Sequence, residues 1–321
     1  MMPSVPEIGA RIQQVRGQLD RVILGQPKVK EQLLVCLLAG GHALLEGVPG
    51  TGKTLLGLTL ARLLGCRFRR IQFTPDLMPV DLLGTNVFNP QSQTFEFHAG
   101  PIFTDILLAD EVNRTPPRTQ SALLEAMQEK AATIDGTRHA ISDVFLVLAT
   151  QNPIEFEGTY PLPEAQRDRF LLKITVDYPQ AEEEAGILEA YATGNRLHET
   201  PATALSTVLS REDLVSARQA LSQGVRAEKG VQKYILDIVR ATRNNESLQF
   251  GAGPRASLAL LESGRALAAL RGRDFVTPDD VKELVGPVLA HRVSLAPEAE
   301  MEGLGLDDIL RRIFEKVEVP R

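Results

Sequence analysis

Two spacings of hydrophobic residues alternate along the chain between residues 7 and 176. Apolar positions three and four apart indicate helices over 7–22 and 29–38, with a turn between them. Further helices are predicted at 55–64 and 120–129. Short strand patterns bounded by turns occur at residues 43–46, 68–73, 106–109, 144–149 and 171–176. Strands that alternate with helices predict an α/β fold, a three-layer core with a parallel sheet.

The pattern changes near residue 177. A Glu-rich helix is expected at 181–192, and a loop follows it. Beyond the loop we find no strand pattern, and helices are predicted at residues 211–222, 228–245, 254–270, 278–290 and 306–316. Asp213, Thr277 and Asp307 mark expected helix starts. We therefore expect an α/β core over 1–195, a linker over 196–210 and an all-helical domain over 211–321.

Two hairpin patterns interrupt the core. Strand-like residues 85–88 and 94–97 flank a polar turn, and 133–134 and 140–141 flank residues 135–139. They predict β-hairpin insertions at about 84–98 and 131–142. Near the tips, the charged or titratable basic side chains are Arg138, His98 and His139. Hairpins with so little positive charge are poorly suited to holding a nucleic-acid backbone.

Composition narrows the possible classes of protein. The chain has 35 basic and 41 acidic residues, a net charge of −6, which does not indicate a nucleic-acid-binding surface. The apolar runs are shorter than the ~20 residues that a membrane span needs. Cys36 and Cys66 form no disulfide framework, and we find no export signal. A cytoplasmic protein is therefore expected.

A phosphate-binding motif lies between the first strand and the next helix. It reads G-x-x-x-x-G-K-T and consists of Gly47, Val48, Pro49, Gly50, Thr51, Gly52, Lys53 and Thr54, with Leu55 following in the helix. Glycines let backbone N–H groups turn toward phosphate oxygens, and the helix N-terminus adds positive potential. Lys53 is expected to reach the β- and γ-phosphates of ATP, and the Thr54 hydroxyl to ligate Mg²⁺.

Candidate hydrolytic residues follow two other strands. The strand 106–109 ends in Asp110, expected to hold Mg²⁺, and Glu111, expected to orient and deprotonate the attacking water. The strand 68–73 lies between this motif and the phosphate loop, an order typical of motor ATPases with an additional strand. Asn152 follows the strand 144–149, where it either contacts the γ-phosphate and water or caps a turn before proline.

Over nearly its full length the chain resembles the MoxR family of AAA+ ATPases, in the helix-2-insert clade. The stretches that carry the resemblance are 22–26, 47–54, 74–79, 100–103, 108–114, 122–127, 149–153, 157–166 and 168–170. The resemblance implies a P-loop AAA+ core followed by a helical lid domain. It also implies a homo-oligomer, a hexameric ring with a pore lined by the two hairpins. Such rings act as chaperone-like remodelling or maturation factors for a protein complex or metalloenzyme, with a partner that carries a von Willebrand factor A domain.

The resemblance also assigns roles to individual residues. Asn152 matches sensor 1, and Gly25 and Gln26 would lie near the adenine. Arg169 matches the arginine finger, which reaches the γ-phosphate bound by a neighbouring subunit. Arg167 lies beside it, and the choice between these two arginines as the finger stays open.

Arg255 matches sensor 2, on a lid that would cover the nucleotide of its own chain. By residue type alone, a surface arginine at a helix start is the favoured interpretation of Arg255, and an arginine at a strand edge paired with Asp168 is that of Arg169.

Three other functions fit parts of the pattern. A nucleic-acid motor of the MCM type shares both hairpins but requires a basic pore. The ATPase subunit of magnesium chelatase shares the layout but has longer insertions. A nucleotide switch without turnover would not need the Asp110–Glu111 pair. The acidic core and weakly charged hairpins favour an ATP-hydrolysing motor with a protein client.

Overall fold

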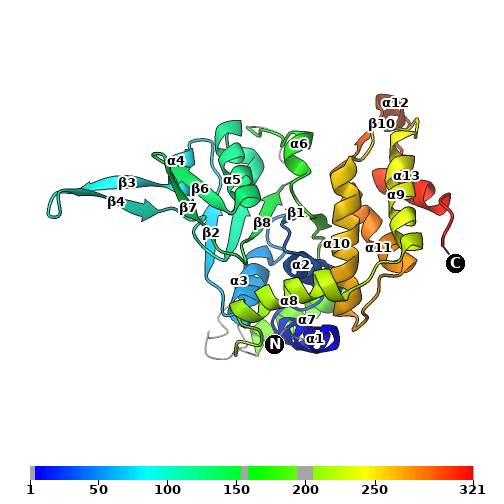
Figure 1. The fold of residues 1–321 in the computed structure, drawn as a ribbon, viewed down its shortest axis with the longest axis horizontal. Helices are drawn as coiled ribbons and strands as arrows, with labels where there is room; N and C mark the ends of the chain where they lie inside the picture. Colours follow the sequence, from blue (N-terminus) through cyan, green and yellow to red (C-terminus); the bar gives the residue numbers. More distant parts are fainter. Residues whose placement is uncertain (1–3, 153–157, 194–204, 321) are drawn as a thin grey trace.

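Five parallel strands form the central sheet of the computed structural model, which describes residues 4–152, 158–193 and 205–320. Residues 153–157 lie outside the described residues; of these, Pro153 and Glu157 belong to stretches that carry the family resemblance. The sheet has the order β2-β5-β8-β1-β9 (Figure 1), with bounds β1 (Ala43–Glu46), β2 (Phe68–Gln72), β5 (Ile106–Asp110), β8 (Leu146–Gln151) and β9 (Leu172–Thr175). All five strands predicted from the sequence are present.

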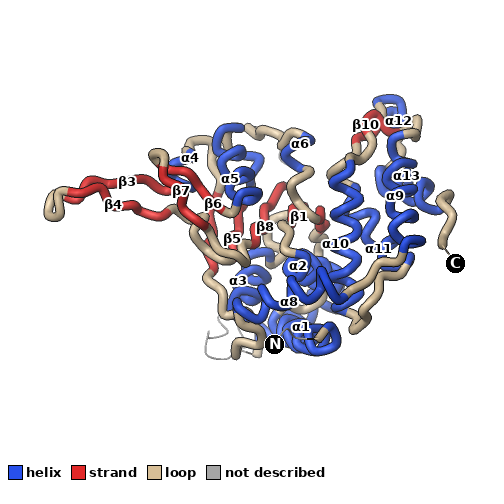
Figure 2. The backbone as a smooth tube through the Cα atoms, viewed as in Figure 1, coloured by secondary structure: helices blue, strands red, loops and turns tan. Residues whose placement is uncertain are grey.

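Alternating side chains of these strands pack into two different hydrophobic clusters. In β5, Ile106 and Leu108 belong to one cluster, and Leu107 and Ala109 belong to the other. The first cluster includes residues of α1 (Val5–Val22), α2 (Pro27–Ala39) and α3 (Lys53–Leu63). The second includes residues of α4 (Pro79–Leu83) and α5 (Pro117–Glu129). Helices therefore cover both faces of the sheet, and the three-layer core is confirmed (Figure 2).

The C-terminal region is helical, as predicted. Its helices are α8 (Arg211–Gly224), α9 (Lys229–Arg243), α10 (Pro254–Leu270), α11 (Pro278–Leu289), α12 (Pro297–Met301) and α13 (Leu306–Glu315). Helix α8 begins at Arg211, two residues before the expected Asp213, because Ser210 is the N-cap and its Oγ accepts from Asp213 N. A small antiparallel pair, β10 (Leu248–Phe250) and β11 (Ser294–Leu295), was not predicted, since such short strands show no alternation.

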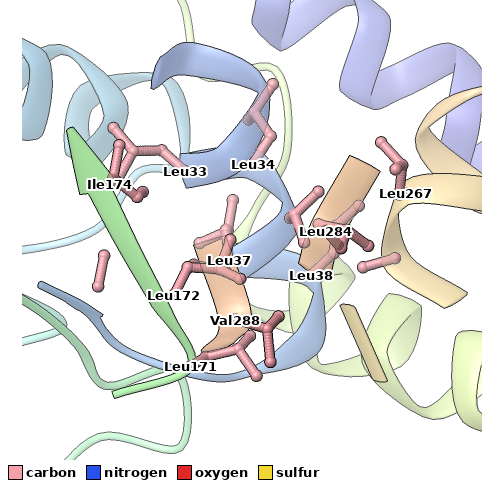
Figure 3. Packing of buried hydrophobic residues seen from close by; sticks show 14 of the residues in the cluster. Leu33, Leu34, Leu37, Leu38, Leu171, Leu172, Ile174, Leu267, Leu284 and Val288 are labelled. Atoms are coloured by element: carbon pink, nitrogen blue, oxygen red, sulfur yellow. The ribbon is translucent and has the colours of Figure 1, made fainter. Parts of the chain in front are cut away.

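Helix α2 joins the core to the helical region. Its leucines, among them Leu34 and Leu38, pack between Leu172 of β9 and residues of the helical region such as Leu267 and Leu284 (Figure 3). One hydrophobic cluster thus runs from α1 to α13. The expected linker at 196–210 lies largely outside the described residues, and the division into domains stays a prediction.

Both predicted hairpins are present. The first, β3 (Gly84–Asn89) and β4 (Thr94–Ala99), extends away from the body of the molecule (Figure 1). The second, β6 (Ala131–Ile134) and β7 (Thr137–Ala140), turns at Asp135–Gly136 rather than over the five residues 135–139. Both turn residues have positive φ, of 48° and 79°, as an Asp-Gly hairpin turn requires.

The remaining elements connect these parts. They are the 3₁₀ helix η1 (Val112–Arg114), α6 (Glu164–Arg167) and α7 (Ala181–Ala192), the last as predicted. None of the helices within the described ranges is long and apolar enough to cross a membrane.

Candidate nucleotide site

The phosphate loop connects β1 to α3 at the carboxyl edge of the sheet. Gly50 and Gly52 have φ of 83° and 82°, a left-handed conformation that glycine adopts without strain. Thr51 Oγ1 donates to Val48 O at 3.1 Å, which closes the loop on itself. Gln26 Nε2 donates to Thr51 O at 3.0 Å and ties the loop to the turn before α2. These contacts hold the loop in one shape, in which most of its residues line one cavity.

That cavity has a volume of about 560 Å³ and collects most of the predicted site residues. Those that line it are Gly47, Pro49, Gly50, Thr51, Gly52, Lys53, Thr54, Leu55, Asp110, Glu111 and Asn152. Val48 is not among the lining residues, and its carbonyl instead accepts hydrogen bonds from within the loop. Strands β1, β5 and β8 are adjacent, so their carboxyl ends bring the three motifs together.

Lys53 is directed at the loop. Its Nζ donates to Gly47 O and Val48 O, at 2.8 Å in each case. Partial burial lowers the pKa of the ammonium group, while Asp110 and Glu111 favour its charged form. The charged amine therefore stands where the phosphates of a nucleotide would pass.

Thr150 links the two acidic residues. Its Oγ1 donates to Asp110 Oδ1 at 3.2 Å and accepts from Glu111 N at 2.8 Å. Glu111 has a φ of 57°, an unusual value for a residue with a side chain. The threonine hydroxyl thus fixes both the carboxylate of Asp110 and the backbone that aims Glu111.

Three further polar residues hold the carboxylates and were not predicted. Arg70 Nε donates to Asp110 Oδ2 at 2.6 Å, and Gln72 Nε2 donates to Glu111 Oε2 at 2.7 Å. Arg114 pairs with the same Glu111 oxygen at 2.8 Å. Residues 70 and 72 share one face of β2, whose Gln72 lies in register with Asp110. Strand alternation would have identified this face, but sequence alone did not show that β2 lies next to β5.

A second cavity of about 190 Å³ adjoins the phosphate loop. It is lined by Val22, Ile23, Leu24, Gln26, Gly50, Thr51, Gly52, Leu55, Pro179, Ile187 and Tyr191. Gly25 is not among the lining residues, and a Cβ there would come within 2.1 Å of the Glu183 carboxylate. The mainly apolar lining suits a purine ring, and the place of Gly25 and Gln26 near the adenine stays a prediction. The contribution of α7, through Ile187 and Tyr191, was not predicted.

The predicted arginines lie elsewhere. Arg169 and Arg255 line a separate cavity of about 240 Å³, and neither lines the phosphate cavity. Arg169 Nη1 donates to Leu124 O at 3.0 Å, and Arg255 lies 3.7 Å from Asp168. Arg167, 3.9 Å from Glu164, lines neither cavity.

The expected placement of Arg255 over the nucleotide of its own chain is therefore not found. Helix α10 packs against α1 and α2, so its first turn, which carries Arg255, lies beside Asp168 rather than above the phosphate loop.

The residues around the phosphate loop fit Mg²⁺–nucleotide chemistry. A hydroxyl at Thr54 and a carboxylate at Asp110 are oxygen ligands of the kind that Mg²⁺ prefers. The glycine turns, Lys53 and the N-terminus of α3 provide donors and positive charge for phosphate.

Thr150→Val is expected to lower the turnover number by about 10- to 100-fold, because small displacements of catalytic groups have effects of this size. The variant keeps the side-chain volume but removes both hydrogen bonds to the acidic pair. Steady-state kinetics at saturating ATP measure the effect. Thr59→Val in α3 is the matched control, since the buried Thr59 hydroxyl has no hydrogen-bond partner among the described residues. Equal activity in both variants would show that the Thr150 hydroxyl does not position the carboxylates.

Together, the parallel sheet, the phosphate loop and the acidic pair define a P-loop ATPase of the AAA+ class. Residues 42–172 match the profile "ATPase family associated with various cellular activities (AAA)", and residues 240–313 match an AAA lid domain. The structure is similar to that of a Cytophaga hutchinsonii protein assigned as an ATPase, with a TM-score of 0.90 and 40% identity. The similarity covers 98% of this chain and 96% of that one.

Similar proteins identify the family within the AAA+ ATPases. The chain is 46% identical over 302 residues to the uncharacterized Bacillus subtilis protein YeaC, covering 94% of this chain and 92% of the relative. It is 44% identical over 313 residues to the chaperone MoxR1 of Mycobacterium tuberculosis, covering 95% and 81%. A third relative, the MoxR protein of Paracoccus denitrificans, is 32% identical over 322 residues, covering 94% and 93%. The chain belongs to the MoxR family of AAA+ ATPases.

Proposed function

We propose that this chain hydrolyses ATP as a subunit of a ring, a hexamer by family resemblance, and uses the energy to remodel a protein client. The division of the site between two places on one chain supports this most directly. The phosphate cavity contains the loop and the acidic pair, whereas Arg169 and Arg255 line another cavity. A chain that offers both halves can complete its sites only with neighbours that do the same.

Within the phosphate cavity each side chain has a separate task. Lys53 holds the β- and γ-phosphates, and Thr54 and Asp110 hold Mg²⁺. The metal supplies positive charge that polarises the phosphates. Glu111 accepts the proton of the attacking water, and Asn152 positions that water against the γ-phosphate.

The neighbouring subunit supplies the remaining charge. Arg169 neutralises the negative charge that spreads over the γ-phosphoryl group in the transition state. We place Arg255 with Arg169 at this shared site, because the two line the same cavity. This assignment replaces the role over its own nucleotide that the sequence suggested.

A protein client fits the hairpin surfaces better than a nucleic acid. Phe88 and Phe95 of the first hairpin are 49% and 71% exposed and contact each other edge to face, with ring centroids 5.4 Å apart. Such exposed apolar side chains suit contact with polypeptide. Near the hairpin tips the one arginine is Arg138. This is too little positive charge to bind the phosphate backbone of a nucleic acid. The related MoxR1 is named a chaperone. From the family resemblance we also propose a partner protein with a von Willebrand factor A domain.

We place the protein in the cytoplasm. Cys36 is a buried thiol, and partial burial raises the pKa of Cys66 to about 11, so both are poorly reactive free cysteines. Free thiols of this kind are typical of proteins from a reducing compartment.

Sedimentation velocity with Mg²⁺ and ATP tests the assembly. We expect the species to shift from monomer toward a ring as protein concentration rises, and turnover per subunit to rise over the same range. Full turnover by monomers at the lowest concentrations would contradict the shared site.

A further inference from the structure

Arg70 is the second cation of the phosphate cavity. Among the described residues that line it, Lys53 and Arg70 are the basic ones, and Asp110 and Glu111 are the acidic ones. The formal charges of these four side chains cancel. A nucleotide carries several negative charges, so a cation that can turn from a carboxylate to a phosphate has a large effect on affinity.

The Arg70 side chain is hydrogen-bonded to Asp110 and is still exposed to solvent. Its Nε donates to Asp110 Oδ2 at 2.6 Å, yet the side chain is 52% exposed. Strand β2 is the edge strand of the sheet. A guanidinium group has five N–H donors, and the hydrogen bond to Asp110 uses one of them. The group can therefore change partners without disturbing the packed core.

The preceding residue offers a natural comparison. Arg69 lies on the opposite face of β2, where its Nη1 donates to Gly100 O at 3.2 Å, and it does not line the phosphate cavity. The two arginines share strand, charge and sequence surroundings. Only the orientation toward the phosphate loop differs, because successive strand residues point to opposite faces.

We propose that Arg70 is a nucleotide-specificity residue, whose guanidinium exchanges the Asp110 carboxylate for the terminal phosphate of ATP. The inference rests on the ATP site proposed above. The exchange would leave both oxygens of Asp110 free of Arg70 when ATP is bound. Arginine suits this role, since its N–H groups match phosphate oxygens in pairs. ADP lacks the γ-phosphate, so Arg70 keeps its bond to Asp110 when ADP binds. A single chain thereby distinguishes ATP from ADP before any neighbour contributes.

Equilibrium binding of AMP-PNP and of ADP, each with Mg²⁺, tests this by isothermal titration calorimetry. Arg70→Gln is expected to weaken AMP-PNP binding by about tenfold or more, the usual effect of losing a charge-assisted hydrogen bond, and ADP binding by less than about twofold. Arg69→Gln is expected to leave both affinities unchanged.

The measured affinities test the role of Arg70 separately from the ATP site itself. Equal weakening of both nucleotides, or none, overturns the role of Arg70. A parent protein that binds neither nucleotide overturns the ATP site itself. If thermal unfolding shows that Arg70→Gln does not fold, Arg70→Lys decides. The lysine keeps the charge but loses the paired geometry, so AMP-PNP alone should bind more weakly, and an equal loss for both nucleotides contradicts the proposal.

Discussion

Arg169→Ala is expected to lower ATP turnover by about 10³–10⁵-fold, the range that arginine fingers contribute in phosphoryl transfer. The reason is that Arg169 and Arg255 are the arginines among the described residues that line this cavity, while His42 there is buried and burial lowers its pKa to about 4. Binding of the nucleotide to its own chain should change little, because Arg169 does not line the phosphate cavity. Turnover per subunit against protein concentration, with nucleotide affinity measured separately, checks both expectations.

Two further variants show whether a loss of ATP turnover is specific to Arg169. Arg226→Ala is the control, since Arg226 is an exposed arginine paired with Asp274 and lies in the helical region. It should retain the turnover of the parent. Arg167→Ala decides between the two candidate fingers. If Arg167→Ala loses turnover and Arg169→Ala does not, Arg167 is the finger; if both retain it at every concentration, neither of these two arginines is the finger.

Glu111→Gln is expected to lower turnover by about 10²–10⁴-fold, the usual contribution of a general base. An amide cannot accept the proton of the attacking water. Glutamine keeps the size of the side chain, and the left-handed backbone at this position, with φ of 57°, is one that Gln26 and Gln93 also adopt in this chain. The variant should therefore bind ATP as the parent does, and single-turnover kinetics should show the defect in the chemical step.

Mixing the two inactive proteins gives the sharpest measurement. A subunit with Glu111→Gln still carries Arg169, and a subunit with Arg169→Ala still carries Glu111. In a random equal mixture about a quarter of the shared sites are intact, so partial turnover should return if Arg169 acts between subunits. Mixtures as inactive as their components would contradict a site divided between neighbours.

The sequence by itself determined the elements and most of the phosphate site. The five strands, the two hairpins and the helical C-terminal region follow from local periodicity, which depends on residues close in the chain. The phosphate loop, Asp110, Glu111 and Asn152 were also predictable. Each follows a strand directly, and parallel strands end at one edge of a sheet, so the motifs meet wherever those strands lie.

Only the tertiary structure decided which side chains surround that site. Arg70 and Gln72 hold the acidic pair because β2 is the neighbour of β5, a pairing that no local pattern specifies. Ile187 and Tyr191 reach the adenine-side cavity because α7 returns to the phosphate loop. Arg255 lies beside Asp168 because α10 packs on α1 and α2. The physical reason is the same in each case: contacts between residues distant in the chain depend on how whole elements pack, and the spacing of apolar residues within one element does not specify its partners.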